Sequence, residues 1–74
     1  MSLKKLRQNK KLTQMGLAKL VFVNQKTISN WENGTREPSL QVLPKLAETL
    51  NCSIEELVYA IIESKQQKDL TATN

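Results

Sequence analysis

The apolar residues of this chain recur at the spacing of short amphipathic helices. Apolar side chains three or four residues apart lie on one face of a helix, and this spacing divides the chain into five segments. We predict helices over residues 3–10, 14–21, 25–32, 44–50 and 54–64. Nowhere does the sequence alternate apolar and polar residues as a half-buried strand does. The pattern therefore predicts an all-α fold of five short helices.

Residues that favour helix ends lie at these boundaries. Gly34, after the third segment, suits the left-handed backbone that ends many helices. Pro44 is placed at the first position of the fourth helix, because a proline further in would remove a backbone hydrogen bond. Residues 40–43 are then expected to form a turn, and the polar residues 65–74 a disordered tail. The predicted N-caps are Ser2, Thr13, Asn24 and Ser53.

The third predicted helix has an unusually polar face. Its apolar residues Ile28 and Trp31 lie on one side, where we expect both to pack in the core. A solvated face usually carries Glu, Lys and Arg, which form helices better than Asn or Ser. Amides suit adenine edges and an ammonium suits guanine, so DNA reading is one interpretation of this face and a merely solvated surface is the other. The polar side contains Gln25, Lys26, Ser29, Asn30 and Asn33.

Charge is distributed unevenly along the chain. Residues 1–38 contain eight basic and two acidic residues, a net charge of +6, whereas residues 39–74 contain three basic and five acidic residues, a net charge of −2. The basic half includes the polar face, so a polyanionic partner is predicted for that half alone. Four of its lysines are interpreted as a solubilising surface, with phosphate contact as the alternative: Lys4, Lys5, Lys10 and Lys11.

The composition argues against several other classes of protein. With Cys52 as the only cysteine and no histidine, a disulfide within the chain is impossible and a zinc site is disfavoured. Cys52 is expected to be a small core side chain, because no base lies near it in the sequence to activate the thiol. No catalytic constellation, cofactor motif, effector site or membrane-spanning apolar run is present, and we expect a cytoplasmic protein.

Three stretches follow one another in a familiar order and spacing: LKKLRQNKKLTQ, LTQMGLAKLVFVNQKTISNWENG and LPKLAETLNCSIEELV. In them the sequence resembles the Cro/CI-type (XRE-like) family of helix-turn-helix regulators, over about residues 3–58. The resemblance implies a lambda-repressor-like fold. It places a domain at residues 1–64, with the helix-turn-helix at about residues 14–33, and it implies double-stranded DNA as the partner.

The resemblance also implies roles for individual residues. Arg7 and Glu32 match a structural ion pair that ties the first helix to the third. The residues that match base-contacting positions are Gln25, Lys26, Ser29 and Asn30. The residues that match positions against phosphates or sugars are Gln14, Asn24, Thr27, Asn33, Thr35 and Arg36.

One residue departs from the family pattern. Phe22 lies in the turn where the family usually has glycine, and a bulky residue rarely adopts the positive φ of such a turn. Two explanations are open. Either the turn is built differently, or Phe22 adopts the left-handed backbone because its ring packs against the domain or a neighbouring molecule.

The fifth predicted helix has a wider apolar arc than one packed face needs. Its inward residues are predicted to be Ile54, Leu57, Val58 and Ile61. Tyr59 and Ile62 lie to the side and suggest the interface of a two-fold dimer, with a helix end covering its own core as the alternative. We expect a repressor that binds a palindromic operator as a dimer, because a chain of this length leaves little room for an effector domain. An antitoxin or adaptor that binds a protein partner is the alternative function.

Overall fold

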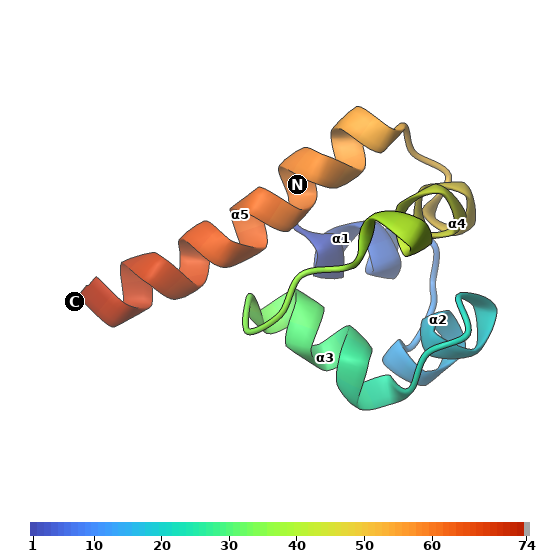
Figure 1. The fold of residues 1–74 in the computed structure, drawn as a ribbon, viewed down its shortest axis with the longest axis horizontal. Coiled ribbons are helices and arrows are strands. Elements are labelled where there is room, and N and C mark those ends of the chain that lie inside the picture. The colour runs from blue at the N-terminus through green and yellow to red at the C-terminus, as the bar shows by residue number, and fades with distance from the viewer. Residues whose placement is uncertain (74) are drawn as a thin grey trace.

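The computed structural model describes the backbone of residues 1–73 and the side chains of residues 1–66. This part of the chain forms helices and no strand, so the all-α prediction is confirmed (Figure 1). The helices are α1 (Leu3–Asn9), α2 (Gln14–Leu20), α3 (Gln25–Asn33), the 3₁₀ helix η1 (Leu40–Val42), α4 (Leu43–Leu50) and α5 (Ile54–Thr73). The first four predicted α-helices agree with these bounds to within one residue at each end.

Side-chain oxygens cap the N-terminal ends of four helices as predicted. At each N-cap a side-chain oxygen accepts a bond from the backbone N–H three residues on, at 2.8 to 3.2 Å. At the start of α5 the bond is returned, because Oε1 of Glu56 accepts from the N–H of Ser53 at 2.9 Å. The bond from the backbone N–H of Ser53 to the carboxylate, and after it the side chain of Ser53, lower the pKa of Glu56 below its ordinary value. The four caps are Ser2, Thr13, Asn24 and Ser53.

Two helices end in the left-handed backbone. Gly34 closes α3 with φ 78°, and Asn51 closes α4 with φ 56°. The Gly34 position is also crowded, because a Cβ there would lie 2.9 Å from the carbonyl oxygen of Ser64 in α5. Only glycine therefore lets α5 pass this close to the end of α3.

The core draws on every α-helix. Its largest fully buried side chains come one from each helix, and Trp31 of α3 joins them at 5% exposed, as predicted. Cys52 is half-buried and packs against this cluster, where burial and then the charge of Glu56 raise the pKa of its thiol. The five fully buried side chains are Leu3, Leu17, Ile28, Leu46 and Leu57.

Helix α5 is longer than predicted. It was expected to end near Ser64, but the backbone remains helical to Thr73, and α5 extends past the other helices (Figure 1). The sequence after Ser64 contains no Gly or Pro and is rich in Lys and Gln, which favour helix, so nothing local ends it. The tail predicted for residues 65–74 is thus helical through residue 73, and Asn74 lies outside the described residues.

The predicted inward stripe of α5 was partly wrong. Leu57 is fully buried, but Ile54 and Val58 are exposed, and Ala60 and Ser64 take the inward positions. The Oγ of Ser64 accepts from the N–H of Leu3 at 3.4 Å and donates to the carbonyl of Ala60 at 3.0 Å. These two small residues let α5 approach α1 and the end of α3 closely, and this contact sets the rotation of α5 about its axis.

The structure shows which backbone conformation Phe22 adopts in the turn. Its φ is 63°, so the turn between α2 and α3 has the left-handed backbone that the family obtains with glycine. Its side chain is 84% exposed, so the ring does not pack against its own domain. The chain therefore holds a bulky residue in a strained conformation with no contact inside the domain that explains it.

Candidate nucleic-acid interface

Helices α2 and α3 pack against each other across a short turn. Leu17 of α2 and its C-cap residue Val21 share the core with Ile28 of α3, and Ala18 between them is small enough to let the helices come close. The N–H of Val23 bonds to the carbonyl of Ala18 at 3.0 Å and closes the turn. This packing holds one side of α3 against the domain and leaves the other side outward.

The predicted base-contacting residues are on that outward side. Gln25 and Lys26 are exposed, and Ser29 and Asn30 are half-buried. The amide of Asn33 donates to the hydroxyl of Ser29 at 3.4 Å, which links two residues of the face one turn apart. The structure therefore places hydrogen-bonding groups, and one ammonium, along a single outer surface of α3.

The ion pair implied by the resemblance lies beneath this surface. Nε of Arg7 is 2.6 Å from Oε2 of Glu32, and Nη2 of Arg7 donates to Oε1 of Glu32 at 3.3 Å. Nη1 of Arg7 also donates to the carbonyl of Leu12 at 2.7 Å. The Arg7 and Glu32 side chains are only 10% and 4% exposed, so the pair ties α1, the α1–α2 turn and α3 together in the interior.

Two further residues extend this pair toward the outer face. Nε2 of Gln14, at the start of α2, donates to Oε1 of Glu32 at 3.1 Å. Nε2 of Gln25, at the start of α3, then donates to Oε1 of Gln14 at 3.5 Å. The chain of polar groups from Arg7 to Gln25 was not predicted, because Gln14 is 18 residues from Glu32 and 11 from Gln25, too far for any local spacing to indicate a contact.

The predicted phosphate-contacting residues fall at the two ends of α3. Gln14, Asn24 and Thr27 lie at its N-terminal end, where Oδ1 of Asn24 accepts from both the N–H and the hydroxyl of Thr27 at 2.8 Å. At the other end the N–H groups of Thr35 and Arg36 both bond to the carbonyl of Asn30, at 3.0 and 3.3 Å. A hollow of about 300 Å³ separates part of α3 from the following loop and is lined by Thr27, Asn30, Trp31, Arg36 and Glu37.

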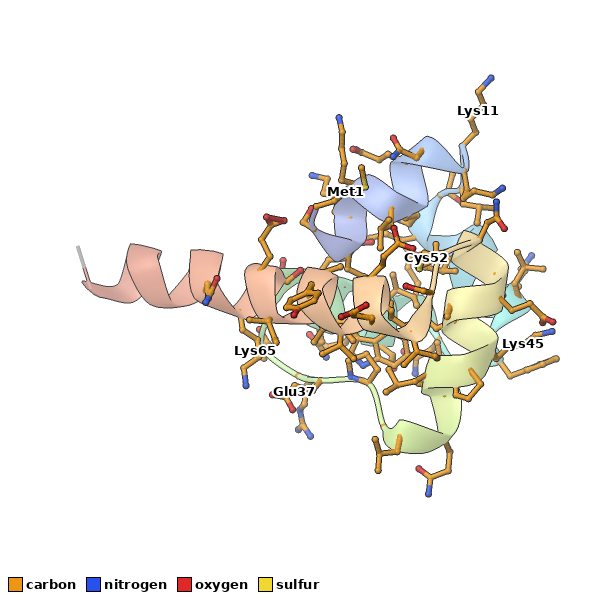
Figure 2. The ribbon with its side chains drawn as sticks, turned by 90° about the horizontal axis from the view of Figure 1, so that it is seen from above. Met1, Lys11, Glu37, Lys45, Cys52 and Lys65 are labelled. Atoms are coloured by element: carbon orange, nitrogen blue, oxygen red, sulfur yellow. The ribbon has the colours of Figure 1, made fainter. Side chains whose placement is uncertain are left out.

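Most cations of the first half have no acidic partner. Its two acidic residues are already used, because Glu32 pairs with Arg7 and Glu37 pairs with Lys65 of α5 (Figure 2). Within the described residues, seven exposed cations of the first half form no ion pair. They are Lys4, Lys5, Lys10, Lys11, Lys19, Lys26 and Arg36. Of these, Lys26 belongs to α3 itself and Arg36 lines the hollow between α3 and the following loop.

The described residues hold no group of three or more His, Cys, Asp or Glu side chains that could bind a metal ion. Among the same residues, no helix is long and apolar enough to cross a membrane.

A short polar helix, packed on a second helix across a tight turn and exposed along its outer face, is the helix-turn-helix arrangement. Residues 3–57 match the helix-turn-helix family, and the chain belongs to that family. It is 36% identical over 56 residues to the HTH-type transcriptional activator BcrR of Enterococcus faecalis, a match that covers 76% of this chain and 28% of BcrR. The chain thus matches little more than a quarter of the length of BcrR.

The fold is also similar to a solved structure. The crystal structure of the clp gene regulator ClgR from Corynebacterium glutamicum superposes with a TM-score of 0.72 at 25% sequence identity. The match covers 96% of this chain and 80% of that one. This similarity extends the family assignment from the sequence to the arrangement of the helices.

Proposed function

We propose that this protein is a transcriptional regulator that recognises double-stranded DNA by placing α3 in the major groove. The observation that carries the proposal is the outer face of α3, where amide, hydroxyl and ammonium groups lie on one surface, in the half of the chain whose exposed cations form no ion pair among the described residues. Membership of the helix-turn-helix family supports the same assignment. Binding, and not catalysis, is the proposed activity.

Four side chains of α3 supply the proposed base contacts: Gln25, Lys26, Ser29 and Asn30. The amides of Gln25 and Asn30 each combine a donor and an acceptor, which matches the N7 and N6 groups of adenine. The ammonium of Lys26 only donates, which matches N7 and O6 of guanine. Each such contact discriminates by about 1–3 kcal/mol.

The phosphate contacts are proposed for the two ends of α3. At the N-terminal end of α3 the DNA backbone would be held by Gln14, Asn24 and Thr27. At the C-terminal end it would be held by Asn33, Thr35 and Arg36. Contacts of this kind fix the register of a protein on DNA without reading its sequence. The unpaired lysines and Arg36 would replace counterions, so the affinity should fall steeply as salt concentration rises.

The short length of α3 supports a dimer. Nine residues at about 1.5 Å each span about 14 Å, so one copy reaches only a few base pairs. Two copies related by a two-fold axis would read a palindrome whose half-sites are about 34 Å apart. Tyr59 and Ile62 of α5, at 64% and 43% exposed, supply the proposed interface. Ile62 also borders an apolar groove of about 400 Å³ between α5 and the segment containing Leu40.

Repression is the regulatory outcome that we propose, because a dimer lying across an operator blocks other proteins from the same DNA. BcrR is a transcriptional activator, so both an increase and a decrease in expression have to be tested. A promoter–reporter assay with the selected operator upstream of, or overlapping, the transcription start decides between them. Repression predicts lower expression when the protein is supplied.

The experiment that tests base reading begins with selection of bound sites from random DNA. Gln25→Ala and Asn30→Ala should each weaken the selected site by about 1–3 kcal/mol and leave random DNA nearly unaffected. Arg36→Ala is the matched control, because a lost phosphate contact should weaken both DNAs alike. Equal losses on both DNAs in the α3 variants would contradict the proposal.

The dimer is tested with Ile62→Glu. A charge placed twice at a symmetric interface should prevent association, so sedimentation at micromolar concentration should show a folded monomer and a gel shift should lose its preference for the palindrome over a half-site. Leu20→Glu alters a similarly exposed apolar residue of α2 and should leave sedimentation unchanged. A dimer that persists in Ile62→Glu would place the interface elsewhere.

The apolar groove also favours a second candidate function, that of an antitoxin or adaptor whose main partner is a protein. Co-expression with the neighbouring gene product, followed by purification, distinguishes the two. A stoichiometric complex that Ile62→Glu disrupts would support the adaptor, and purification of this chain alone would support the DNA-binding regulator.

A further inference from the structure

We infer that Glu32 determines the base preference of Gln25, although the Glu32 side chain lies in the interior and is only 4% exposed. It would do so by orienting two side-chain amides in series, first Gln14 and then Gln25. The inference rests on the proposed function, in which Gln25 contacts a base edge. It gives a residue of the buried ion pair a role in specificity beyond its role in the fold.

The first step is the orientation of Gln14. Oε1 of Glu32 accepts from Gln14 at 3.1 Å, while both carboxylate oxygens accept from the guanidinium of Arg7. Glu32 is the acidic partner of an ion pair with Arg7, and a carboxylate only accepts hydrogen bonds. Gln14 must therefore turn its NH₂ group toward Glu32, and its amide oxygen is left pointing away.

The second step is the orientation of Gln25. The amide oxygen of Gln14 has Nε2 of Gln25 as its partner, at 3.5 Å. The reverse orientation of Gln25 would bring two amide oxygens together with no proton between them. The carboxylate of Glu32 thus selects one of the two amide orientations at Gln25, through Gln14.

This orientation limits the hydrogen-bonding groups that Gln25 can offer to DNA. The nitrogen of Gln25 carries two hydrogens, and one of them is directed at Gln14. One donor and one acceptor remain for DNA, which is the pattern that matches adenine. Guanine presents two acceptors in the major groove, so it would leave its O6 facing the amide oxygen of Gln25. A Gln25 amide that was free to turn could direct both of its hydrogens at guanine.

The test measures base preference at one position. Selection from random DNA with the wild type and with Gln25→Ala first identifies the base pair that Gln25 reads. Glu32→Gln then replaces the carboxylate by an amide of the same size, which can donate as well as accept and so releases Gln14. We expect the preference for adenine over guanine at that base pair to fall about tenfold, on the order of one good contact, while the base pair read by Asn30 keeps its preference.

Two further variants separate this role from stability. Gln14→Leu removes the middle amide and keeps the Arg7–Glu32 pair, so it should relax the same base pair even if Glu32→Gln folds poorly. Glu37→Gln removes an exposed carboxylate of the same half and should change no base preference. The readout is a ratio of affinities for two DNAs measured on one sample, so a loss of folded protein does not alter it.

The outcomes distinguish the inference from the proposed function. If Gln25→Ala changes no position of the site, base reading by Gln25 is wrong and the proposed function loses that contact. If Gln25→Ala relaxes one base pair but Glu32→Gln and Gln14→Leu both keep the wild-type ratio of adenine to guanine there, the inference is overturned and base reading stands.

Discussion

Replacing Phe22 by glycine is expected to stabilise this protein, although the change removes an aromatic side chain. The φ of Phe22 is 63°, in the left-handed region. That conformation costs a residue with a Cβ about 1–2 kcal/mol, because the Cβ approaches the following carbonyl oxygen. Glycine has no Cβ and adopts the same backbone without this cost.

Two smaller effects oppose the gain. The ring is 84% exposed, so the burial lost with it is worth only roughly 0.3–0.5 kcal/mol. Glycine also gives the unfolded chain more freedom, which costs about 0.4–1 kcal/mol. The expected net gain is about 0.5 kcal/mol, or a rise in Tm of about 2–4 °C for a domain of this size.

Phe22→Ala is the matched control, because it removes the ring and keeps the Cβ. Thermal unfolding followed by circular dichroism should place Phe22→Gly above Phe22→Ala by about 1 kcal/mol, or about 4–8 °C. A glycine variant no more stable than the alanine variant would refute a left-handed backbone at this turn. If glycine exceeds alanine but falls below the wild type, and only at high protein concentration, the ring packs against a neighbouring molecule.

Three further changes test other parts of the structure. Glu32→Ala leaves the guanidinium of Arg7 buried without its partner, so it should lower the free energy of unfolding in urea by about 3–5 kcal/mol, and an unchanged urea midpoint would contradict the pair. Gly34→Ala should cost about 1–3 kcal/mol in thermal unfolding, because φ is 78° and the new Cβ would meet the backbone of α5; a wild-type Tm would mean that α5 does not pass this close. Glu56→Gln removes the carboxylate whose pKa is lowered by its bonds with Ser53. Since a lowered carboxyl pKa stabilises the fold above its unfolded-state value and not in acid, the destabilisation should be largest near neutral pH and shrink as pH falls through the folded-state pKa, and a pH-independent difference would contradict it.

The sequence by itself determined the helices and their beginnings. Caps such as Asn24 and ends such as Gly34 depend on groups within a few residues of one another, so their chemistry is visible in the sequence. The outward face of α3 was predictable for the same reason. Ile28 and Trp31 lie three residues apart and turn one side of the helix into the core, which leaves the amides of Gln25 and Asn30 on the other side.

The tertiary structure decided how the helices face one another and which polar groups meet. The apolar pattern of α5 fitted several rotations, and the close packing of Ser64 on α1 and beside Gly34 selected the one that exposes Val58. The bonds of Gln14 likewise join side chains that only the packing of α1, α2 and α3 brings together. Local spacing constrains groups within one turn of a helix, whereas contacts between helices depend on the shapes of all the side chains that fill the space between them.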